Sequence, residues 1–521
     1  MRNTKVLVVS AILLMSLQAM LSSAQDKKEE PKPAEKTAQV TPPPKEESSV
    51  TDHTLRIGSQ TISYKATAGT ILLKDEKGEP NASLFYIAYT KSDVKDSIQR
   101  PIAFIYNGGP GSSSVWLHMG AFGPRRVVTV DAKPTPPAPY KYEDNPDCLL
   151  DKSDLVFIDP VGTGFSHAVG KAQDKHFWGI DEDVKSLAQF ITAYVSRNNR
   201  WNSSKYLIGE SYGTFRSAAL GNYLQSHDGM DLNGIVLISS VLDLGTLSFP
   251  PGQDLPYVLY LPSYAATAWY HKTLKEPPSD LNAFLTEARK FTLTDYAGAL
   301  LKGSDLSPEE KASLLKRLSY FTGLSEEYIS KARLRVKLPQ FMEELQRSKG
   351  MTTGRLDARF TGPTFDLLGE NAEYDPMSSA ISGAFTAVFN DYVRQELRFG
   401  YDKTYTILSE VAGRQWNWKR KGQGESDTEG FPGAPNVGQD MVQALIANAH
   451  LRIQVENGIY DLATPFFATE YTMNHLGLPR DLEDHIHMNY YEAGHMMYLN
   501  DASRTKLKAN IAAFIESSSA K

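Results

Sequence analysis

The sequence predicts an α/β fold, with a central, mostly parallel sheet, flanking helices and a helical insertion. Short apolar runs that end in Gly or Pro alternate with helical patterns, which is typical of parallel strands joined by crossover helices. A long middle segment, 244–438, has helix signals without that alternation. The composition, 41% hydrophobic and 22% charged, is that of a globular protein and not of a disordered one.

The first 50 residues predict export and a linker rather than part of the fold. Residues 1–24 combine Arg2 and Lys5 with a short apolar run and small residues, as a signal peptide does. The run is short for a membrane span and contains polar residues. Residues 25–50 are rich in Pro, Lys, Glu and Ala and predict a disordered linker. We therefore expect an exported protein, periplasmic or extracellular, without stable membrane insertion after signal cleavage.

Charge and cysteine content exclude some classes of function. The formal net charge of -6 provides no basic surface for nucleic acid. Cys148 is the only cysteine, so an intramolecular disulfide is impossible, which fits a bacterial periplasm or outer surface. His485 and His487 could share one face of a strand, but spacing places no third ligand. We expect no metal and no cofactor, and the sequence leaves the oligomeric state unknown.

Strand signals support the sheet in chain order. Apolar and β-branched runs predict antiparallel strands at 61–65, 70–73 and 83–90, with a hairpin loop between the last two. Parallel strands are predicted at 102–106, 155–158, 206–208, 235–238, 451–455 and 487–491. Most of these runs end at a turn residue, as strands of an open sheet do.

The middle segment divides the expected catalytic domain into 51–243 and 439–521. Its helix signals lie at 279–291, 307–318 and 325–333. Ser307 is suited to cap the second of these helices, because Pro and two acids follow it. We expect 244–438 to be a mostly helical insertion that forms a lid. A continuation of the core and a separate domain outside the sheet are the alternatives.

A nucleophile motif follows the third parallel strand. The sequence GESYG at 209–213 fits G-x-S-x-G between a strand and a helix, where a tight turn exposes the Ser211 hydroxyl. An ordinary glycine-rich turn is the alternative. In an α/β-hydrolase fold an acid and then a His follow in the chain; Asp461 and His495 each come after a strand. The predicted triad is Ser211, Asp461 and His495, in which His takes the Ser proton and Asp orients the His.

A glycine-rich loop follows the strand 102–106. The sequence NGGPG at 107–111 allows backbone N–H groups to approach a bound group, as an oxyanion hole requires. The residue after the nucleophile, Tyr212, is expected to supply another N–H. A phosphate-binding loop is the rival interpretation, but no Gly-Lys-Ser/Thr follows.

The chain resembles the serine carboxypeptidase family over about 60–240 and 440–515. The matching blocks are NGGPG at 107–111, Ser113-Ser114, Gly123-Pro124, DPVGTGFS at 159–166, GESYG at 209–213, NGIYD at 457–461 and GHM at 494–496. The resemblance implies an enzyme that removes C-terminal residues from peptides through an acyl-enzyme, usually at acidic pH. It also implies the triad named above.

Further site residues follow from the resemblance alone. It implies that the N–H groups of Gly109 and Tyr212 form the oxyanion hole. It also implies that Asn107, Gly108 and Glu210 bind the substrate's C-terminal carboxylate.

Three positions depart from the family pattern. Ile105 stands where the family commonly has Trp, Ala121 where a second carboxylate-binding Glu would fall, and Ser112 where the family has Cys. Without that second acid, Glu210 should lose one cause of a raised pKa. These departures affect carboxypeptidase specificity more than hydrolase activity. An esterase or acyltransferase acting on a small ester, and an inactive hydrolase-like binding protein, are therefore the alternatives.

Overall fold

The computed structural model describes residues 44–420 and 434–519. The expected signal peptide, 1–24, and the linker as far as residue 43 lie outside these ranges. Strand β1 begins at Ser48, so the last residues of the expected linker belong to the sheet. In the described part of the chain, no helix is both long and apolar enough to cross a membrane.

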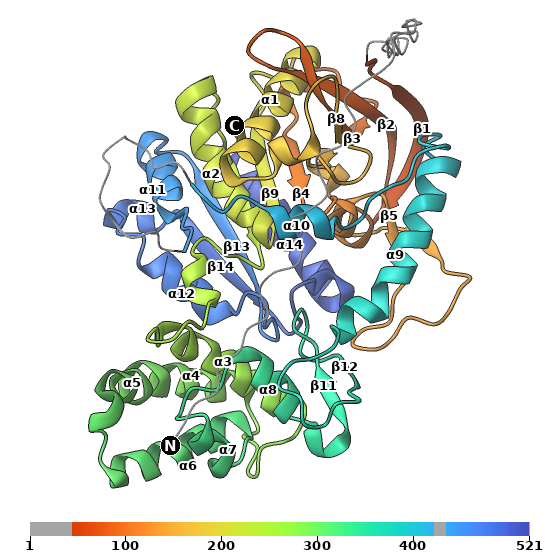
Figure 1. Cartoon of the computed structure of the whole chain (residues 1–521). Coiled ribbons are helices and arrows are strands. Elements are labelled where there is room, and N and C mark those ends of the chain that lie inside the picture. The colour runs from red at the N-terminus through yellow and green to blue at the C-terminus, as the bar shows by residue number, and fades with distance from the viewer. Residues whose placement is uncertain (1–43, 421–433, 520–521) are drawn as a thin grey trace, which may run out of the picture. The chain divides into compact units, whose positions relative to one another are not determined.

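The described residues form a central ten-stranded sheet (Figure 1). Its order is β1-β2-β3-β7-β4-β9-β10-β13-β14, with β8 beside β3. Neighbours from β1 to β7 pair antiparallel, and neighbours from β7 to β14 pair parallel. The strands are β1 Ser48–Ile57, β2 Gln60–Lys74, β3 Pro80–Lys91, β4 Ile102–Tyr106, β7 Asp154–Ile158, β8 His167–Ala168, β9 Lys205–Glu210, β10 Gly234–Ile238, β13 Arg452–Gly458 and β14 Ile486–Tyr491.

This sheet confirms the predicted α/β fold with a central, mostly parallel sheet. Each of the six predicted parallel strands is present, within a few residues of its predicted ends. One strand prediction was wrong: 61–65 and 70–73 are parts of the single strand β2. Its ladder with β1 and β3 runs through Gly69, so pairing on both sides overrides the weak strand signal there.

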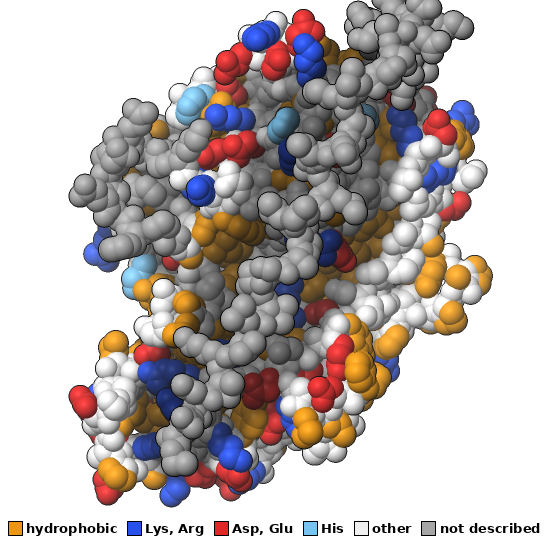
Figure 2. Space-filling view, in the orientation of Figure 1, with side chains coloured by type: hydrophobic (Ala, Val, Ile, Leu, Met, Phe, Trp, Pro, Cys, Tyr) orange, Lys and Arg blue, Asp and Glu red, His pale blue; other side chains and the backbone are white. Residues whose placement is uncertain are grey.

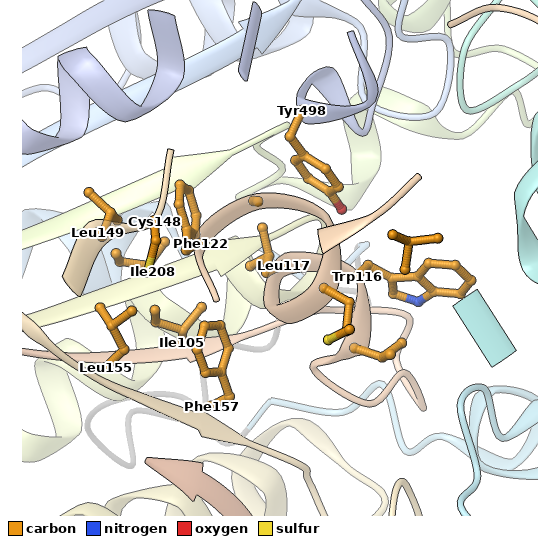
Figure 3. Packing of buried hydrophobic residues seen from close by; sticks show 14 of the residues in the cluster. Ile105, Trp116, Leu117, Phe122, Cys148, Leu149, Leu155, Phe157, Ile208 and Tyr498 are labelled. Atoms are coloured by element: carbon orange, nitrogen blue, oxygen red, sulfur yellow. The ribbon is translucent and has the colours of Figure 1, made fainter. Parts of the chain in front are cut away.

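Helices cover both faces of the sheet. Alternate residues of β4 show the division, because Phe104 packs in one apolar cluster and Ile105 in the other. The Phe104 face is covered by α1 Ile180–Arg197, α2 Tyr212–Asp228 and α11 Gly438–Ala447. The Ile105 face is covered by the π-helix η2 Leu117–Phe122, α9 Pro376–Gln395 and α14 Asp501–Ser518. Figure 3 shows Leu117 and Phe122 lying over the strands near Ile105 and Ile208.

The middle segment contains two differently packed parts. Helices α3 to α8 share a third apolar cluster, which also includes Phe466 and Phe467 of α12 (Phe466–Asn474). By contrast, the buried side chains of α9 join the cluster on the sheet. The bounds of the first group are α3 Leu255–Tyr270, α4 Leu281–Phe291, α5 Ala297–Lys302, α6 Pro308–Thr322, α7 Glu326–Lys331 and α8 Leu338–Glu344.

Smaller elements complete this segment. Ser307 caps α6 as its sequence suggests, and Glu310 closes the capping box. The short strands β11 (Met351–Thr353) and β12 (Thr361–Pro363) pair antiparallel, within the segment that was predicted to be mostly helical. Helix α10 covers Glu410–Gln415. Figure 2 shows basic and acidic side chains interspersed on the visible surface, with hydrophobic ones gathered near β11 and β12.

Candidate active site

Ser211 lies at a strained turn between β9 and α2. Its backbone has φ 60° and ψ -129°, a conformation that non-glycine residues rarely adopt. The turn is held by a hydrogen bond of 3.0 Å from Ser211 N to Ile238 O. A Cβ on Gly209 would lie 2.3 Å from Gly213 O, so both ends of the G-x-S-x-G motif must approach without side chains. Strain of this kind is kept where packing over-determines the turn, and it clusters at functional sites.

The glycine-rich loop lies directly against this turn. A Cβ on Gly108 would lie 2.4 Å from Tyr212 N and 2.7 Å from Glu210 O. Gly109 has φ +103°, which favours glycine. Tyr212 begins α2, so its N–H has no partner within the helix. In residues 44–420 and 434–519, neither the Gly109 nor the Tyr212 N–H donates a hydrogen bond. Two unused backbone donors are therefore available beside Ser211.

Asp461 and His495 form a buried pair. The distance from His495 Nδ1 to Asp461 Oδ2 is 2.7 Å, and the two residues are 3% and 0% exposed. The Asp461 carboxylate also accepts hydrogen bonds from Ala463 N and from the N–H and hydroxyl of Thr464. Burial lowers the pKa of His495, but the charge of Asp461 and its hydrogen bond outweigh burial and raise it. The pair thus fixes the imidazole with Nδ1 facing the acid.

The His495 loop is held by residues from the middle segment. His495 N donates to Leu356 O at 2.7 Å, and Gly494 N donates to Asp357 Oδ2 at 3.1 Å. Asp357 is 1% exposed and pairs with Arg359 at 2.7 Å. On the other side, Ser239 Oγ donates to His495 O at 2.7 Å. The sequence does not predict this support, because no motif marks the residues between β11 and β12.

Ser211 and His495 line one cavity of about 560 Å³. Within the described ranges they form no hydrogen bond with each other; such contacts often tighten only when substrate binds. The same cavity is lined by Asn107, Gly108, Gly109 and Glu210. Its lining from the middle segment comes from 355–356, α9 and the region of α10, and not from the described helices α3 to α8. The described residues hold no group of three His, Cys, Asp or Glu that could bind a metal.

Glu210 is a buried acid next to the nucleophile. It is 2% exposed and accepts a hydrogen bond of 2.9 Å from Asn107 Nδ2. The amide oxygen of Asn107 is itself used by Leu117 N, at 3.0 Å. Burial raises the pKa of Glu210 to about 7, against the lowering effects of His495, Tyr498 and Asn107. Burial is therefore sufficient to raise this pKa without a second acid.

Ala121 and Ile105, two of the three departures from the family pattern, are both buried apolar positions. Ala121 lies in η2 and Ile105 lies beside Phe157 under that helix (Figure 3). A Cβ on the neighbouring Gly120 would lie 2.6 Å from the ring of Tyr498, so Tyr498 packs against η2. Its hydroxyl is near Glu210, yet Glu210 Oε2 has no hydrogen-bond partner among the described residues. No sequence signal pointed to Tyr498.

Comparison with known proteins agrees with this architecture. Residues 58–246 match the serine carboxypeptidase family. The pheromone-processing carboxypeptidase KEX1 of Saccharomyces cerevisiae is 29% identical over 200 residues, which are 36% of this chain and 26% of that protein. The chain thus aligns with about a quarter of the length of this relative. The serine carboxypeptidase-like 25 protein of Arabidopsis thaliana is 22% identical over 450 residues, 82% of this chain and 79% of that one.

A solved structure shows the same fold. The crystal structure of Kex1(delta)p, a prohormone-processing carboxypeptidase from Saccharomyces cerevisiae, matches with a TM-score of 0.54 and 18% identity. The match covers 86% of this chain and 92% of that one. At that identity the likeness establishes the fold and not the chemistry. The comparisons thus show an α/β-hydrolase fold, in a chain whose residues 58–246 are similar to the serine carboxypeptidase family.

Proposed function

We propose that this protein is a serine-type carboxypeptidase, which removes C-terminal residues from peptides through an acyl-enzyme. One observation carries the proposal: the buried Asn107–Glu210 pair lines the same cavity as Ser211 and His495. A peptidase that requires a free C-terminus needs groups that recognise a carboxylate within one residue of the scissile bond. Asn107 and Glu210 are of the right chemistry and adjoin the nucleophile.

The proposed reaction begins at Ser211. His495 takes the hydroxyl proton while the oxygen attacks the carbonyl carbon of the last peptide bond. His495 then gives that proton to the leaving amine, which departs as the C-terminal residue. A water molecule, deprotonated by His495, attacks the ester on Ser211. As the acyl–oxygen bond breaks, His495 returns the proton to Ser211 Oγ and the shortened peptide leaves. The buried hydrogen bond between His495 and Asp461 supports the role of His495 as the base, because the Asp461 carboxylate stabilises the imidazolium formed in both steps.

The N–H groups of Gly109 and Tyr212 would stabilise the oxyanion of each tetrahedral intermediate. Their lack of partners in the described chain supports this role, as does the contact of the glycine-rich loop with the turn at Ser211. Donors fixed by the backbone need no reorganisation when charge develops, which is why such sites contribute strongly to the rate.

Asn107, Gly108 and Glu210 would receive the substrate's carboxylate. A neutral Glu210 can donate a hydrogen bond to a carboxylate, and its raised pKa keeps it neutral below about pH 7. Gly108 contributes by bringing the loop against the turn without a side chain.

An esterase or acyltransferase on the same residues is the second candidate. Ala121 favours the esterase or acyltransferase, because an alanine at that position supplies no second acid beside Glu210. Only a carboxypeptidase needs such acids to recognise a substrate carboxylate. A small ester would then be the substrate.

One set of substrates separates these candidates. The purified protein is assayed with an N-blocked dipeptide acid, its C-terminal amide and a matched ethyl ester, and its serine is labelled with a fluorophosphonate. A carboxypeptidase should cleave the acid with a higher kcat/KM than the amide. Turnover of the ester alone would reject the peptidase in favour of the esterase. Failure of the fluorophosphonate to label Ser211 would reject both, and would favour an inactive binding protein.

We also propose that the protein is exported to a periplasm or the extracellular medium, and that 244–438 acts as a lid. The N-terminal features of the sequence and the single, buried Cys148 support export without disulfides. Cavity-lining residues from 355–356, α9 and α10 support a lid built from that part of the segment. Cell fractionation with N-terminal sequencing tests export; a cytoplasmic protein that still begins at Met1 would contradict it.

A further inference from the structure

We propose that Arg355, from the loop between β11 and β12, binds the C-terminal carboxylate of the peptide substrate. The inference rests on the proposed carboxypeptidase function and deepens it. Arg355 belongs to none of the sequence blocks shared with the family, and it lies in the middle segment.

The charges that line the cavity single out this residue. Two arginines line it, Arg355 and Arg414. Arg414 is paired with Glu410 one turn away at 3.2 Å, and both side chains are largely exposed. Arg355 is also an exposed residue, but its guanidinium has no hydrogen bond or ion pair in residues 44–420 and 434–519. A cation without a counter-charge in a cavity is suited to an anionic ligand, and the fork of Arg matches the two oxygens of a carboxylate.

The backbone of Arg355 is fixed although its side chain is free. Its N–H donates to Asp375 Oδ2 at 2.7 Å, and its carbonyl accepts from Leu462 N at 3.1 Å. The carbonyl of the next residue, Leu356, accepts a hydrogen bond of 2.7 Å from His495 N. A fixed backbone limits the entropy lost when the side chain orders on a ligand. The free guanidinium also argues against a structural role for this side chain.

The chemistry of the leaving group explains why its carboxylate should meet Arg355. In the proposed reaction His495 protonates the leaving nitrogen. Only the Cα atom of the leaving residue separates that nitrogen from the terminal carboxylate. The carboxylate must therefore lie close to His495, and Arg355 directly precedes the residue that holds His495 in place. An acidic side chain on the last residue would lie farther out, so the main-chain carboxylate is the proposed ligand.

Arg355 also supplies what the Asn107–Glu210 pair lacks. Asn107 is uncharged and already donates to Glu210. Glu210 becomes an anion at high pH and would then repel a substrate carboxylate. A guanidinium remains charged at every working pH, so it can retain the carboxylate when Glu210 ionises.

The first test compares Arg355→Met with Arg414→Met as the matched control. The substrates are N-blocked Phe–Leu as free acid, N-blocked Phe–Leu amide, and N-blocked Phe–Glu α-amide. For the free acid, Arg355→Met should lower kcat/KM by ~10- to 100-fold, mainly through KM, as loss of a charged hydrogen-bonded pair does. The loss for the amide should be much smaller, because it is limited to the effect of the Arg355 charge on the pKa of His495. Arg355→Lys should retain part of the preference, because it keeps the charge and loses the fork. Arg414→Met should leave the ratio of kcat/KM for the acid to that for the amide unchanged.

Three results would overturn the inference. Equal losses for acid and amide would show that Arg355 supports the structure and reads no carboxylate. A loss confined to the Phe–Glu α-amide would assign the side-chain carboxylate as the ligand. No loss for either the acid or the amide would show that Arg355 does not contact substrate.

Binding to the Ser211→Ala protein separates this inference from the proposed function. Calorimetry should show that N-blocked Phe–Leu acid binds more tightly than its amide, and that adding Arg355→Met reduces the difference by ~10-fold or more. If that difference is present but the wild type cleaves no peptide, the carboxypeptidase proposal fails and Arg355 still binds the carboxylate. If acid and amide bind Ser211→Ala equally, the Arg355 inference fails whatever the wild type cleaves.

Discussion

Two loops meet at the proposed active site, and different kinds of contact fix their positions. The glycine-rich loop 107–111 lies so close to the turn at Ser211 that an added Cβ on Gly108 would collide with backbone. The loop between β11 and β12 supports the His495 loop through direct hydrogen bonds, which the Leu356 carbonyl accepts from His495 N and the Asp357 carboxylate accepts from Gly494 N. Close packing is therefore the main constraint on the nucleophile side. The base side combines hydrogen bonds with a close approach of Gly494 to Asp357, where an added Cβ would lie 2.4 Å from the Asp357 Cβ. A substitution on the nucleophile side should therefore cause a large loss of activity, and one that weakens a hydrogen bond on the base side a smaller loss.

Removing the nucleophile should give the largest effect. Ser211→Ala should lower kcat by ~10⁶-fold if the three proposed triad residues act as a unit. Fluorophosphonate labelling should be lost as well. The melting temperature should not fall, because the change removes one hydroxyl from a strained turn. Near-normal turnover by a preparation free of wild-type enzyme would contradict the assignment of Ser211.

Gly108→Ala tests the close packing on the nucleophile side. The new Cβ would lie 2.4 Å from Tyr212 N, so the turn or the loop must shift. Displacing one oxyanion donor costs ~10²- to 10³-fold in kcat, and we expect a loss of that size. The matched control is Gly298→Ala in α5, where a Cβ meets nothing within 4 Å. That change should leave kcat unaltered. Equal activity of the two variants would show that this contact is not critical.

The same contrast explains what the sequence could predict. Local patterns predict the parallel strands, the turn at Ser211 and the positions of Asp461 and His495. Strand ends and the need for glycine depend on residues that are adjacent in the sequence. The continuity of β2 through Gly69 could not be predicted, since it depends on pairing with two other strands. The packing of α9 on the sheet, away from α3 to α8, likewise depends on contacts distant in sequence.

Site residues that act through space were missed for the same reason. Tyr498 reaches Glu210 and η2 only because α14 and the loop before it fold back over the sheet. Arg355 and Asp357 are ordinary polar residues in the sequence, and only the fold brings them beside His495. Burial, which sets the pKa of Glu210, is also a property of the whole fold.

Asp357→Asn tests the hydrogen-bonded side and should have a graded effect. It weakens the bond to Gly494 N and the ion pair with Arg359, so the His495 loop should lose part of its order. We expect kcat to fall by ~10-fold, less than the cost of a full 1 Å misplacement of a catalytic group. The melting temperature should fall too. Asp131→Asn is the control, because Asp131 is a partly exposed partner of Arg359 and does not contact the His loop. A loss as large as that of Ser211→Ala would contradict the contrast between the loops.

The smallest expected effect concerns Glu210 and pH. Burial raises the pKa of Glu210 to about 7, so the group is neutral below that pH and an anion above it. The anion repels a substrate carboxylate, so kcat/KM for a free acid should fall as pH rises through about 7. His495 must be neutral to act as a base, and its raised pKa lowers activity on the acid side for every substrate.

The ratio of kcat/KM for a dipeptide acid to that for its amide removes the shared His495 effect and leaves that of Glu210. In the wild type this ratio should decline by several fold between pH ~5 and ~9. Part of the preference for the acid should remain at high pH, because Arg355 keeps its charge. Glu210→Gln is neutral at every pH, so its ratio should be flat. A ratio that declines in the same way in Glu210→Gln would show that another group titrates, and that Glu210 does not read the carboxylate.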